Sequence, residues 1–267
     1  MSERVFITGG ASGLGRALAA HYVRGGWRVL IGDIDEERGG ETASAFDSHG
    51  DIEFRRLDVR SEEDFIEARS WLEKNWGGLD VLYNNAGVAG MGRFERIPLE
   101  DWDWMLDICL MGVVRGCREF APLFKTQGHG HIVNIASMAG LLNPPIMTNY
   151  NVAKAGVVSL SETLRYELEP YGVYTTVACP SFFETNLPDS IRTPDPELAE
   201  RMKKLLTRSE LTADDVARLI AEAVAQRRFM ALPHRSARRT WRFKRYIPAL
   251  VDRQMRRLGQ HYKRKFS

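Results

Sequence analysis

The stretch "RVFITGGASGLG", Arg4–Gly15, decides the fold of this chain. Its first five residues form the short apolar run expected of a buried strand. Glycines at positions 9, 13 and 15 then permit a tight turn, a close approach of the backbone to a pyrophosphate, and packing of a helix on the strand. The helix that follows presents free N–H groups and a favourable dipole to phosphate at its first turn. This order of strand, glycine turn and helix predicts a nucleotide-binding α/β fold.

Short strands and longer helices alternate along the rest of the chain. We expect helices from Ser61 to about Asn75, over about 101–125, and from Tyr150 to about Glu169, where Pro170 ends the last of them. Further strands are expected over residues 28–32, 52–58, 79–87, 131–137, 173–180 and 228–233. Such alternation predicts parallel strands joined by right-handed crossovers. The predicted fold is a single-domain Rossmann fold over residues 1–233, a doubly wound parallel sheet with helices on both faces, followed by a basic C-terminal helical appendage over 234–267.

Composition limits the class of protein. The 267 residues are 44% hydrophobic, enough for one substantial core. The three cysteines, Cys109, Cys117 and Cys179, lack disulfide-like or metal-like spacing and favour a reduced, cytoplasmic setting, so no metal site is expected. The N-terminus runs directly into a strand pattern, so no signal peptide is expected. No apolar run approaches the ~20 residues needed to span a bilayer.

An acid follows the second predicted strand. Asp33 lies at its end, where a carboxylate can hydrogen-bond the ribose hydroxyls of a dinucleotide and repel a 2′-phosphate. No Arg or Lys stands within the glycine turn or immediately after Asp33 to receive such a phosphate. An Asp in this place also fits a simple surface turn. We expect NAD as the cofactor, with NADP less favoured.

Six short motifs occur in a recognisable order: "TGGASGLG" (8–15), "LDV" (57–59), "NNAG" (84–87), Ser137 in "NIAS", "YNVAK" (150–154) and "CPSFFET" (179–185). With these motifs the chain resembles the short-chain dehydrogenase/reductase family over roughly residues 3–233. The resemblance implies cofactor contacts by Asp58 and Val59 beside the adenine, by Asn85 and Gly87 along the dinucleotide, and by Thr185 at the nicotinamide. The glycine turn would bind the phosphates through Gly9, Ser12, Gly13, Leu14 and Gly15.

The resemblance also implies a catalytic centre of Ser137, Tyr150 and Lys154. Tyr150 and Lys154 share one helical face because they are four residues apart, and both would also contact the cofactor. Tyr150 would act as general base, or as acid in the reducing direction, while Ser137 holds the substrate oxygen. A free phenol has a pKa near ~10, so activity near neutrality requires a drop of roughly three units, about 4 kcal/mol. We expect the Lys154 ammonium and the oxidised nicotinamide to lower that pKa.

Two positions depart from the family pattern. Cys109, in "CLMG", takes the place of an Asn that typically anchors a water on the proton path to the lysine. A thiol is a weak hydrogen-bonding group, although the backbone carbonyl at 109 could still hold that water. The hypothesis is a slower or rerouted proton relay with the chemical step retained. Ser181 stands where the family often has Gly, which would stiffen the loop at the nicotinamide site.

The resemblance implies that two segments select the substrate, residues 138–149 and 181–206. They contribute Leu141, Leu142, Ile146, Met147, Phe182 and Phe183. These residues suggest an apolar pocket for a hydrophobic secondary alcohol or ketone, although each of them could instead pack the core. No Arg is obviously placed to bind a carboxylate, with Arg93 and Arg192 left as open possibilities.

The end of the chain is strongly basic. Residues 227–267 hold 14 Lys/Arg against one acid, Asp252, within a total net charge of +2. Phe243, Ile247, Leu250, Val251, Met255 and Leu258 follow helical spacing, with Pro248 suited to a first turn. Arg253, Arg256 and Arg257 fall on the opposite side. Three roles stay open for this segment: packing on the body or on a neighbouring subunit, contact with a membrane surface, and binding of nucleic acid, which lacks any recognised module here.

The leading prediction is an NAD-dependent dehydrogenase that forms a homodimer or homotetramer in the cytoplasm, with peripheral membrane contact possible through the tail. The alternative is a nucleotide-binding sensor or scaffold that has lost efficient turnover. This alternative is considered because Cys109 replaces the Asn that is usual in the family.

Overall fold

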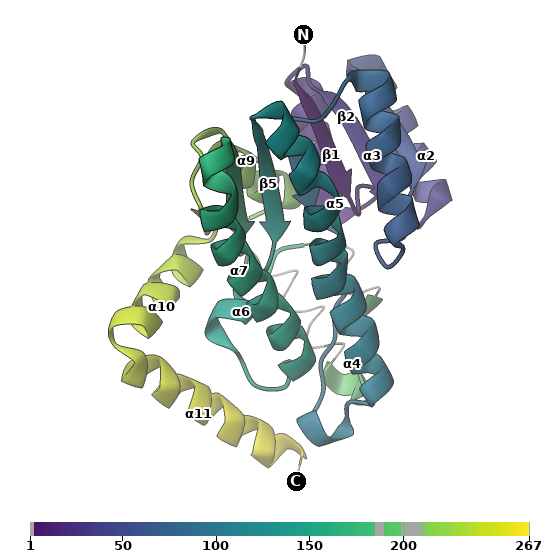
Figure 1. The fold of residues 1–267 in the computed structure, drawn as a ribbon. Helices are drawn as coiled ribbons and strands as arrows, with labels where there is room; N and C mark the ends of the chain where they lie inside the picture. The colour runs from purple at the N-terminus through teal and green to yellow at the C-terminus, as the bar shows by residue number, and fades with distance from the viewer. Residues whose placement is uncertain (1–2, 185–189, 199, 201–208, 210, 267) are drawn as a thin grey trace.

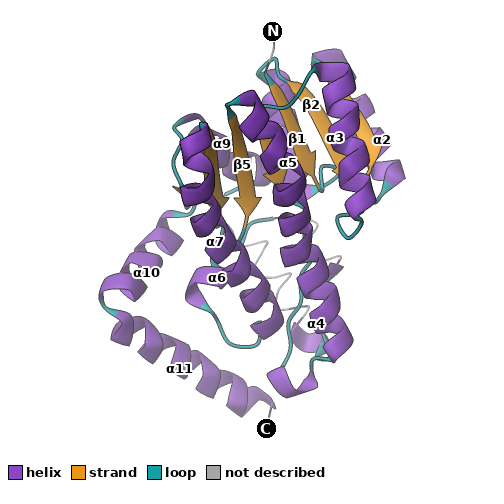
Figure 2. Ribbon diagram, viewed as in Figure 1, coloured by secondary structure: helices purple, strands orange, loops and turns teal. Residues whose placement is uncertain are grey.

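The computed structural model describes residues 3–184, 190–198, 200, 209 and 211–266 of the chain. Within these residues the centre of the molecule is one seven-stranded sheet in the order β3-β2-β1-β4-β5-β6-β7, with every pair parallel (Figure 2). The strands are β1 Arg4–Thr8, β2 Arg28–Asp33, β3 Ile52–Arg56, β4 Val81–Asn84, β5 Gly130–Ile135, β6 Val173–Ala178 and β7 Met230–Ala231. The strand order reverses direction between β1 and β4. In such sheets this switch point leaves a crevice at the carboxyl ends of the strands.

Helices cover both faces of the sheet (Figure 1). Their bounds are α1 Gly13–Arg24, α2 Glu36–Phe46, α3 Glu62–Trp76, α4 Leu99–Leu106, α5 Gly112–Gln127, α6 Ala139–Leu142, α7 Thr148–Leu168, α9 Ala213–Ala225, α10 Arg235–Tyr246 and α11 Pro248–Phe266. One buried cluster joins the sheet to α1, α2 and α9, and a second joins the opposite face to α3, α5 and α7. The predicted doubly wound Rossmann fold is therefore confirmed.

Strand β1 shows how the sequence pattern produces these two layers. Its side chains alternate in direction along the strand. Val5 and Ile7 belong to the cluster under α1 and α9, whereas Phe6 belongs to the cluster under α3 and α5. All three are completely buried. A continuous apolar run is what a central parallel strand needs, because both of its faces are covered.

Several element boundaries differ from the prediction. Helices α2 and α9 were not expected. Two glycines weaken the helical pattern of α2, while α9 carries a signal that could have identified it, the capping box of Thr212 and Asp215. The long helix expected over 101–125 is interrupted by a π-helical turn, Asp107–Met111. Strand β4 ends at Asn84, so the rest of the "NNAG" motif leaves the sheet.

The C-terminal extension forms two helices instead of one. Helices α10 and α11 meet at Ile247, and Pro248 begins α11 as its fixed φ angle favours. The single apolar face predicted for this segment is wrong. Val251, Met255 and Leu258 turn toward the body, whereas Phe243, Ile247 and Leu250 are exposed. The division of the chain into residues 1–233 and 234–267 stays a prediction. Among the described helices, none is both long enough and apolar enough to cross a bilayer.

Candidate active site

A cavity of about 790 Å³ opens at the carboxyl ends of the strands, where the switch point predicts a crevice. One half is bordered by the glycine turn and by the ends of β2 and β3. The other half is bordered by the end of β5, by α7 and by the segment after β6. A charged and glycine-rich half thus adjoins a largely apolar half.

The glycine turn is tightly built. Gly9 adopts a φ of +65°, and a Cβ on this residue would lie 2.8 Å from the Cα of Ala86. A Cβ on Gly15 would collide with the carbonyl oxygen of Gly9. The Asn85 amide holds the turn in place, since its Nδ2 donates to the carbonyl oxygens of Thr8 at 2.9 Å and Gly9 at 3.1 Å. The first turn of α1 therefore opens on the cavity, where its backbone N–H groups can meet phosphate.

The carboxylate of Asp33 borders the same half of the cavity. Its two oxygens accept backbone N–H groups from Ala11 at 3.0 Å and Asp35 at 3.2 Å, which fixes the orientation of the side chain. Arg38 also lines the cavity, and its Nε lies 3.4 Å from Asp35 Oδ2. Sequence inspection missed this cation because it is five residues beyond Asp33 and comes back to the cavity in the first turn of α2.

Asp58 and Val59, which follow the end of β3, line the cavity, and their contact with the adenine stays a prediction. Arg60, which was not predicted, lines it beside them. The Arg60 guanidinium pairs with the carboxylate of Asp58, with 2.6 Å between Nη2 and Oδ2. The hydrogen bond from Arg60, opposed by partial burial, lowers the pKa of Asp58 from its ordinary value. This carboxylate is thus held ionised at the edge of the nucleotide half.

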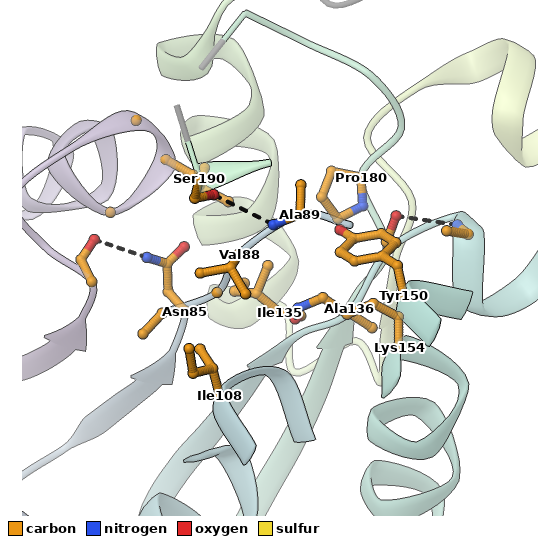
Figure 3. Close-up of a pocket in the computed structure, with 18 of the residues that line it drawn as sticks. Asn85, Val88, Ala89, Ile108, Ile135, Ala136, Tyr150, Lys154, Pro180 and Ser190 are labelled. Atoms are coloured by element: carbon orange, nitrogen blue, oxygen red, sulfur yellow. Dashed lines mark hydrogen bonds between the residues drawn. The ribbon is translucent and has the colours of Figure 1, made fainter. Parts of the chain in front are cut away.

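Ser137, Tyr150 and Lys154 come together in the other half of the cavity. Ser137 follows the end of β5, and its hydroxyl accepts the backbone N–H of Ala139 at 3.1 Å. Lys154 is only 4% exposed, and its Nζ donates to the carbonyl oxygen of Ile135 at 2.9 Å. Figure 3 shows Tyr150 and Lys154 on one side of the cavity next to Ala136, with Asn85 across from them. The predicted catalytic residues therefore share one site with the predicted cofactor residues.

The acidity of Tyr150 depends on the burial of its ring. Burial raises the pKa of Tyr150 above its ordinary value of 10.0, and the neighbouring Cys109 raises it further, whereas a hydrogen bond with Ser137 lowers it. The lowering expected from Lys154 together with oxidised nicotinamide therefore stays a prediction, and burial of the ring acts against it. The Lys154 Nζ lies 5.8 Å from the centroid of the Tyr150 ring and makes its hydrogen bond to Ile135. The physical reason is that desolvation of a buried phenolate outweighs the lowering contribution from Ser137.

Cys109 lies within the π-helical turn between α4 and α5 and is completely buried. Its thiol accepts the backbone N–H of Val88 at 3.3 Å and donates to the Val88 carbonyl at 3.4 Å. The side chain thus fastens the segment after β4 to the helix. A π turn of this kind often marks a functional position because it changes the local backbone pairing.

The apolar half of the cavity contains four of the six predicted pocket residues: Leu142, Met147, Phe182 and Phe183. Leu141 and Ile146 do not line the cavity, because Leu141 packs against the core cluster under α7 and Ile146 packs beside Met147 in a third cluster. Residues that the sequence did not identify complete this half: Val88, Ala89, Trp104, Ile108, Pro144 and Met255.

The two arginines left open as carboxylate ligands have other partners. Arg93 pairs with Asp195 at 3.0 Å. Arg192 pairs with Asp101 at 3.2 Å, and its guanidinium lies 4.0 Å from the centroid of the Trp104 ring. Among the described residues that line the cavity, the cations are Arg38, Arg60 and Lys154. None of these stands in the apolar half except Lys154, which belongs to the catalytic group.

The C-terminal extension reaches the site. Met255 of α11 lines the apolar half, and Tyr262 packs against the cluster that contains Tyr150. At the start of α10, His234 Nδ1 accepts the backbone N–H of Ser181 at 3.2 Å. Ser181, the second departure from the family pattern, itself lines the cavity. The segment at the mouth of the pocket is therefore tied directly to the tail.

Apart from one residue, every predicted cofactor and catalytic residue lines this cavity. These are Gly9, Ser12, Gly13, Leu14, Gly15, Asp33, Asp58, Val59, Asn85, Gly87, Ser137, Tyr150 and Lys154. Thr185 lies outside the described residues. Within the described part of the chain, no group of three or more His, Cys, Asp or Glu side chains is arranged to hold a metal ion.

Comparison with known proteins agrees with this arrangement. The chain is 36% identical over 185 residues to the "Probable oxidoreductase EphD" of Mycobacterium tuberculosis, a match that covers 68% of this chain but only 31% of that protein. It is 33% identical over 223 residues to the 2-(R)-hydroxypropyl-CoM dehydrogenase of Xanthobacter autotrophicus, covering 81% of this chain and 89% of that protein. A crystal structure of a short-chain dehydrogenase/reductase from Burkholderia phymatum in complex with NAD is 32% identical, with a TM-score of 0.88 and coverage of 93% of this chain and 95% of that one.

The family model described as "short chain dehydrogenase" matches residues 3–196. This range includes the glycine turn, Asp33 and all three residues of the catalytic group. The chain therefore belongs to the short-chain dehydrogenase/reductase family of oxidoreductases.

Proposed function

We propose that this protein is an NAD-dependent dehydrogenase that interconverts a hydrophobic secondary alcohol and the corresponding ketone. The main support for this proposal is that Ser137, Tyr150 and Lys154 line the same cavity as the glycine turn and Asp33. Proton transfer and dinucleotide binding are then possible at one place. The apolar second half of that cavity supplies the rest of the substrate site.

The residues present fit a dinucleotide. The space at Gly9 and Gly15 would be filled by any side chain, and the start of α1 faces the cavity with its N–H groups. We assign the pyrophosphate to this turn, the adenosine ribose to Asp33, and the adenine edge to Asp58 and Val59. A dinucleotide held by these residues would supply the hydride acceptor for oxidation of the alcohol carbon and the hydride donor for reduction of the ketone.

Tyr150 is the residue to which we assign the proton. Its hydroxyl accepts the proton of the substrate alcohol in oxidation and donates a proton to the ketone oxygen in reduction. Ser137 hydrogen-bonds the same substrate oxygen and keeps it within reach of Tyr150. Because burial raises the pKa of Tyr150, a phenolate must be favoured by positive charge, for which we assign the Lys154 ammonium and the charge of oxidised nicotinamide.

The substrate is proposed to be neutral and apolar where it meets the protein. The lining beyond Tyr150 consists mainly of aliphatic and aromatic side chains, and the two candidate arginines are engaged with Asp195 and Asp101. A carboxylate or phosphate in this half would find no arginine among the described lining residues. Met255 contributes one wall, so we propose that α11 takes part in selecting the substrate.

NAD is proposed over NADP because Asp33 carries a negative charge at the ribose position. Arg38 is the described cation nearest in sequence that could favour a 2′-phosphate, and it lies against Asp35. The charge of Arg38 is therefore partly compensated by Asp35, which supports the same preference.

The test is a screen of apolar secondary alcohols and ketones with NAD(H) and NADP(H) side by side. We expect turnover with NAD(H), and a loss of roughly 10²–10⁴-fold in Tyr150→Phe, the usual contribution of general acid–base catalysis. NADH affinity, measured by fluorescence titration, should be retained in that variant. Unchanged turnover in Tyr150→Phe would contradict the role of Tyr150 in proton transfer. Tighter binding of NADPH than of NADH would contradict the preference for NAD. Tight NADH binding without activity across the panel would favour the sensor or scaffold instead.

We also propose a homodimer or homotetramer in the cytoplasm. The three cysteines are buried and form no disulfide, which supports a reducing compartment. Sedimentation velocity of the full chain gives the size of the assembly, and a purely monomeric species at micromolar concentration would contradict the proposal.

A further inference from the structure

The corner between α10 and α11 carries a group of large apolar side chains that the fold leaves in water. Phe243, Tyr246, Ile247 and Leu250 are 52%, 77%, 47% and 56% exposed. Phe243 and Tyr246 lie at the end of α10, Ile247 lies at the junction and Leu250 lies in the first turn of α11, so all four fall within eight positions along the bend. We call this group the apolar corner; the bend between α10 and α11 that carries it lies at the edge of the molecule in Figure 1.

The inner faces of the same helices are well occupied. Ala237 and Val251 are buried, and Trp241 packs against the core cluster under α7. The Lys244 Nζ donates to the carbonyl oxygen of Leu141 at 2.6 Å, and Lys265 pairs with Glu197 at 3.0 Å. Because these contacts hold the tail to the body on its other side, the apolar corner is exposed in a folded segment.

Positive charge surrounds the apolar corner. Residues 234–267 contain twelve Lys/Arg and one acid, Asp252. The exposed side chains around the corner include Arg239, Arg242, Arg245 and Arg253. A surface that offers both hydrocarbon and phosphate matches this combination, because apolar side chains enter the boundary between headgroups and acyl chains while cations meet the anionic headgroups.

We propose that the apolar corner is a docking site for the surface of an anionic phospholipid bilayer. Residues 1–226 hold 23 Lys/Arg against 34 Asp/Glu, so a second copy of this chain could also attract the basic tail. A bilayer suits the corner better, because its surface takes in exposed apolar side chains without a matching hollow. The site also has a direct relation to the cavity. Met255, five residues beyond Leu250 on α11, faces the body and lines the substrate half, so docking through the outer face of α11 would hold a helix that forms one wall of the pocket against the membrane. This last step rests on the proposed function, whereas the docking itself does not.

The experiment is co-sedimentation of the full chain with vesicles of phosphatidylcholine alone and with vesicles containing about 30% phosphatidylglycerol, because attraction to anionic lipid adds to apolar insertion. We expect binding to the anionic vesicles at least about tenfold stronger than to the neutral ones, and weaker binding in about 0.5 M salt, which shortens the Debye length.

Two double variants separate the apolar contribution to vesicle binding from the electrostatic contribution. Phe243→Ala combined with Leu250→Ala removes apolar surface and leaves the charge, and it should lower the partition coefficient at least about tenfold. Arg239→Glu combined with Arg242→Glu should abolish the preference for anionic vesicles. The control is Leu99→Ala at the start of α4, which removes an even more exposed leucine away from the tail. Each variant should keep the NADH affinity of the parent, because none of these residues lines the cavity.

Three results would overturn the proposal: no binding to anionic vesicles, equal binding by the Phe243/Leu250 double variant, or a dimer that the double variant dissociates in sedimentation velocity. The last result would assign the apolar corner to a second copy of the chain. Because vesicle binding and NADH binding are measured without a substrate, failure here is distinguishable from failure of the proposed dehydrogenase activity.

Discussion

Replacement of Asp33 by alanine is the sharpest test of the cofactor assignment. The structure holds this carboxylate at the end of β2 by two backbone N–H groups, those of Ala11 and Asp35, and its side chain borders the cavity. Each oxygen has a further lone pair that can accept a ribose hydroxyl. Hydrogen bonds to a charged group contribute about 1.5–3 kcal/mol each in a buried setting, and Asp33 is half-buried.

We therefore expect Asp33→Ala to lose about 2–3 kcal/mol of NADH binding, which corresponds to roughly a 30- to 150-fold higher Kd. NADPH should gain about tenfold in affinity, since a carboxylate no longer repels the 2′-phosphate and Arg38 remains beside it. The assay is fluorescence titration of NADH and NADPH against parent and variant at equal ionic strength, with thermal unfolding measured in parallel. The control is Asp51→Ala, which removes a carboxylate paired with Arg28 at the amino end of β3, away from the cavity.

Equal NADH affinity in parent and Asp33→Ala, with an unchanged melting temperature, would refute the assignment of Asp33 to the ribose. A fall in affinity for both dinucleotides by the same factor would indicate a distorted glycine turn instead of a lost ribose contact.

Four further predictions concern the site and the core. Ser137→Ala removes a hydrogen bond that lowers the pKa of Tyr150, so the alkaline rise of alcohol oxidation, which needs phenolate, should move to higher pH; an unmoved rise in the pH–rate profile would contradict this. Cys109→Asn should raise turnover by restoring a strong hydrogen-bonding group at the π turn, since an amide can make both bonds to the Val88 backbone; stopped-flow and steady-state rates that stay equal or fall, in a folded variant, would remove the idea. Met255→Trp narrows the apolar half of the cavity and should raise KM for the bulkiest alcohol of the panel by about tenfold while sparing the smallest; a uniform change across the panel would argue against a selecting role. His131 is buried and its pKa is lowered from 6.5 to about 4, chiefly by burial. Between these two values the unfolded chain binds the extra proton and the folded chain does not, so stability falls as pH falls. Urea unfolding at pH 7 and pH 5 should show about 2 kcal/mol less stability at pH 5, a difference that His131→Gln should largely remove.

The sequence alone was sufficient for the sheet and for most of the site, because both depend on local pattern. A strand followed by a glycine turn and a helix usually forms the first part of a parallel, doubly wound sheet. In such a sheet the residues at the carboxyl ends of the strands lie at the same edge. Asp33 was therefore found from its position at the end of a strand, whereas Ser137 and the role of Tyr150 came from the family resemblance. The four-residue spacing of Tyr150 and Lys154 placed both on one face of α7 before any contact was known.

Only the tertiary structure decided which side chains complete the cavity and how they titrate. Met255 is more than one hundred residues from Tyr150 along the chain, and no periodicity in the tail indicates that its helix turns back to the pocket. The six apolar residues of the tail looked like one face, but the junction at Ile247 divides them between the body and solvent. The raised pKa of Tyr150 also depends on tertiary structure. Burial of the ring is its main cause, and that burial comes from all the elements that enclose the ring, which no single sequence motif determines.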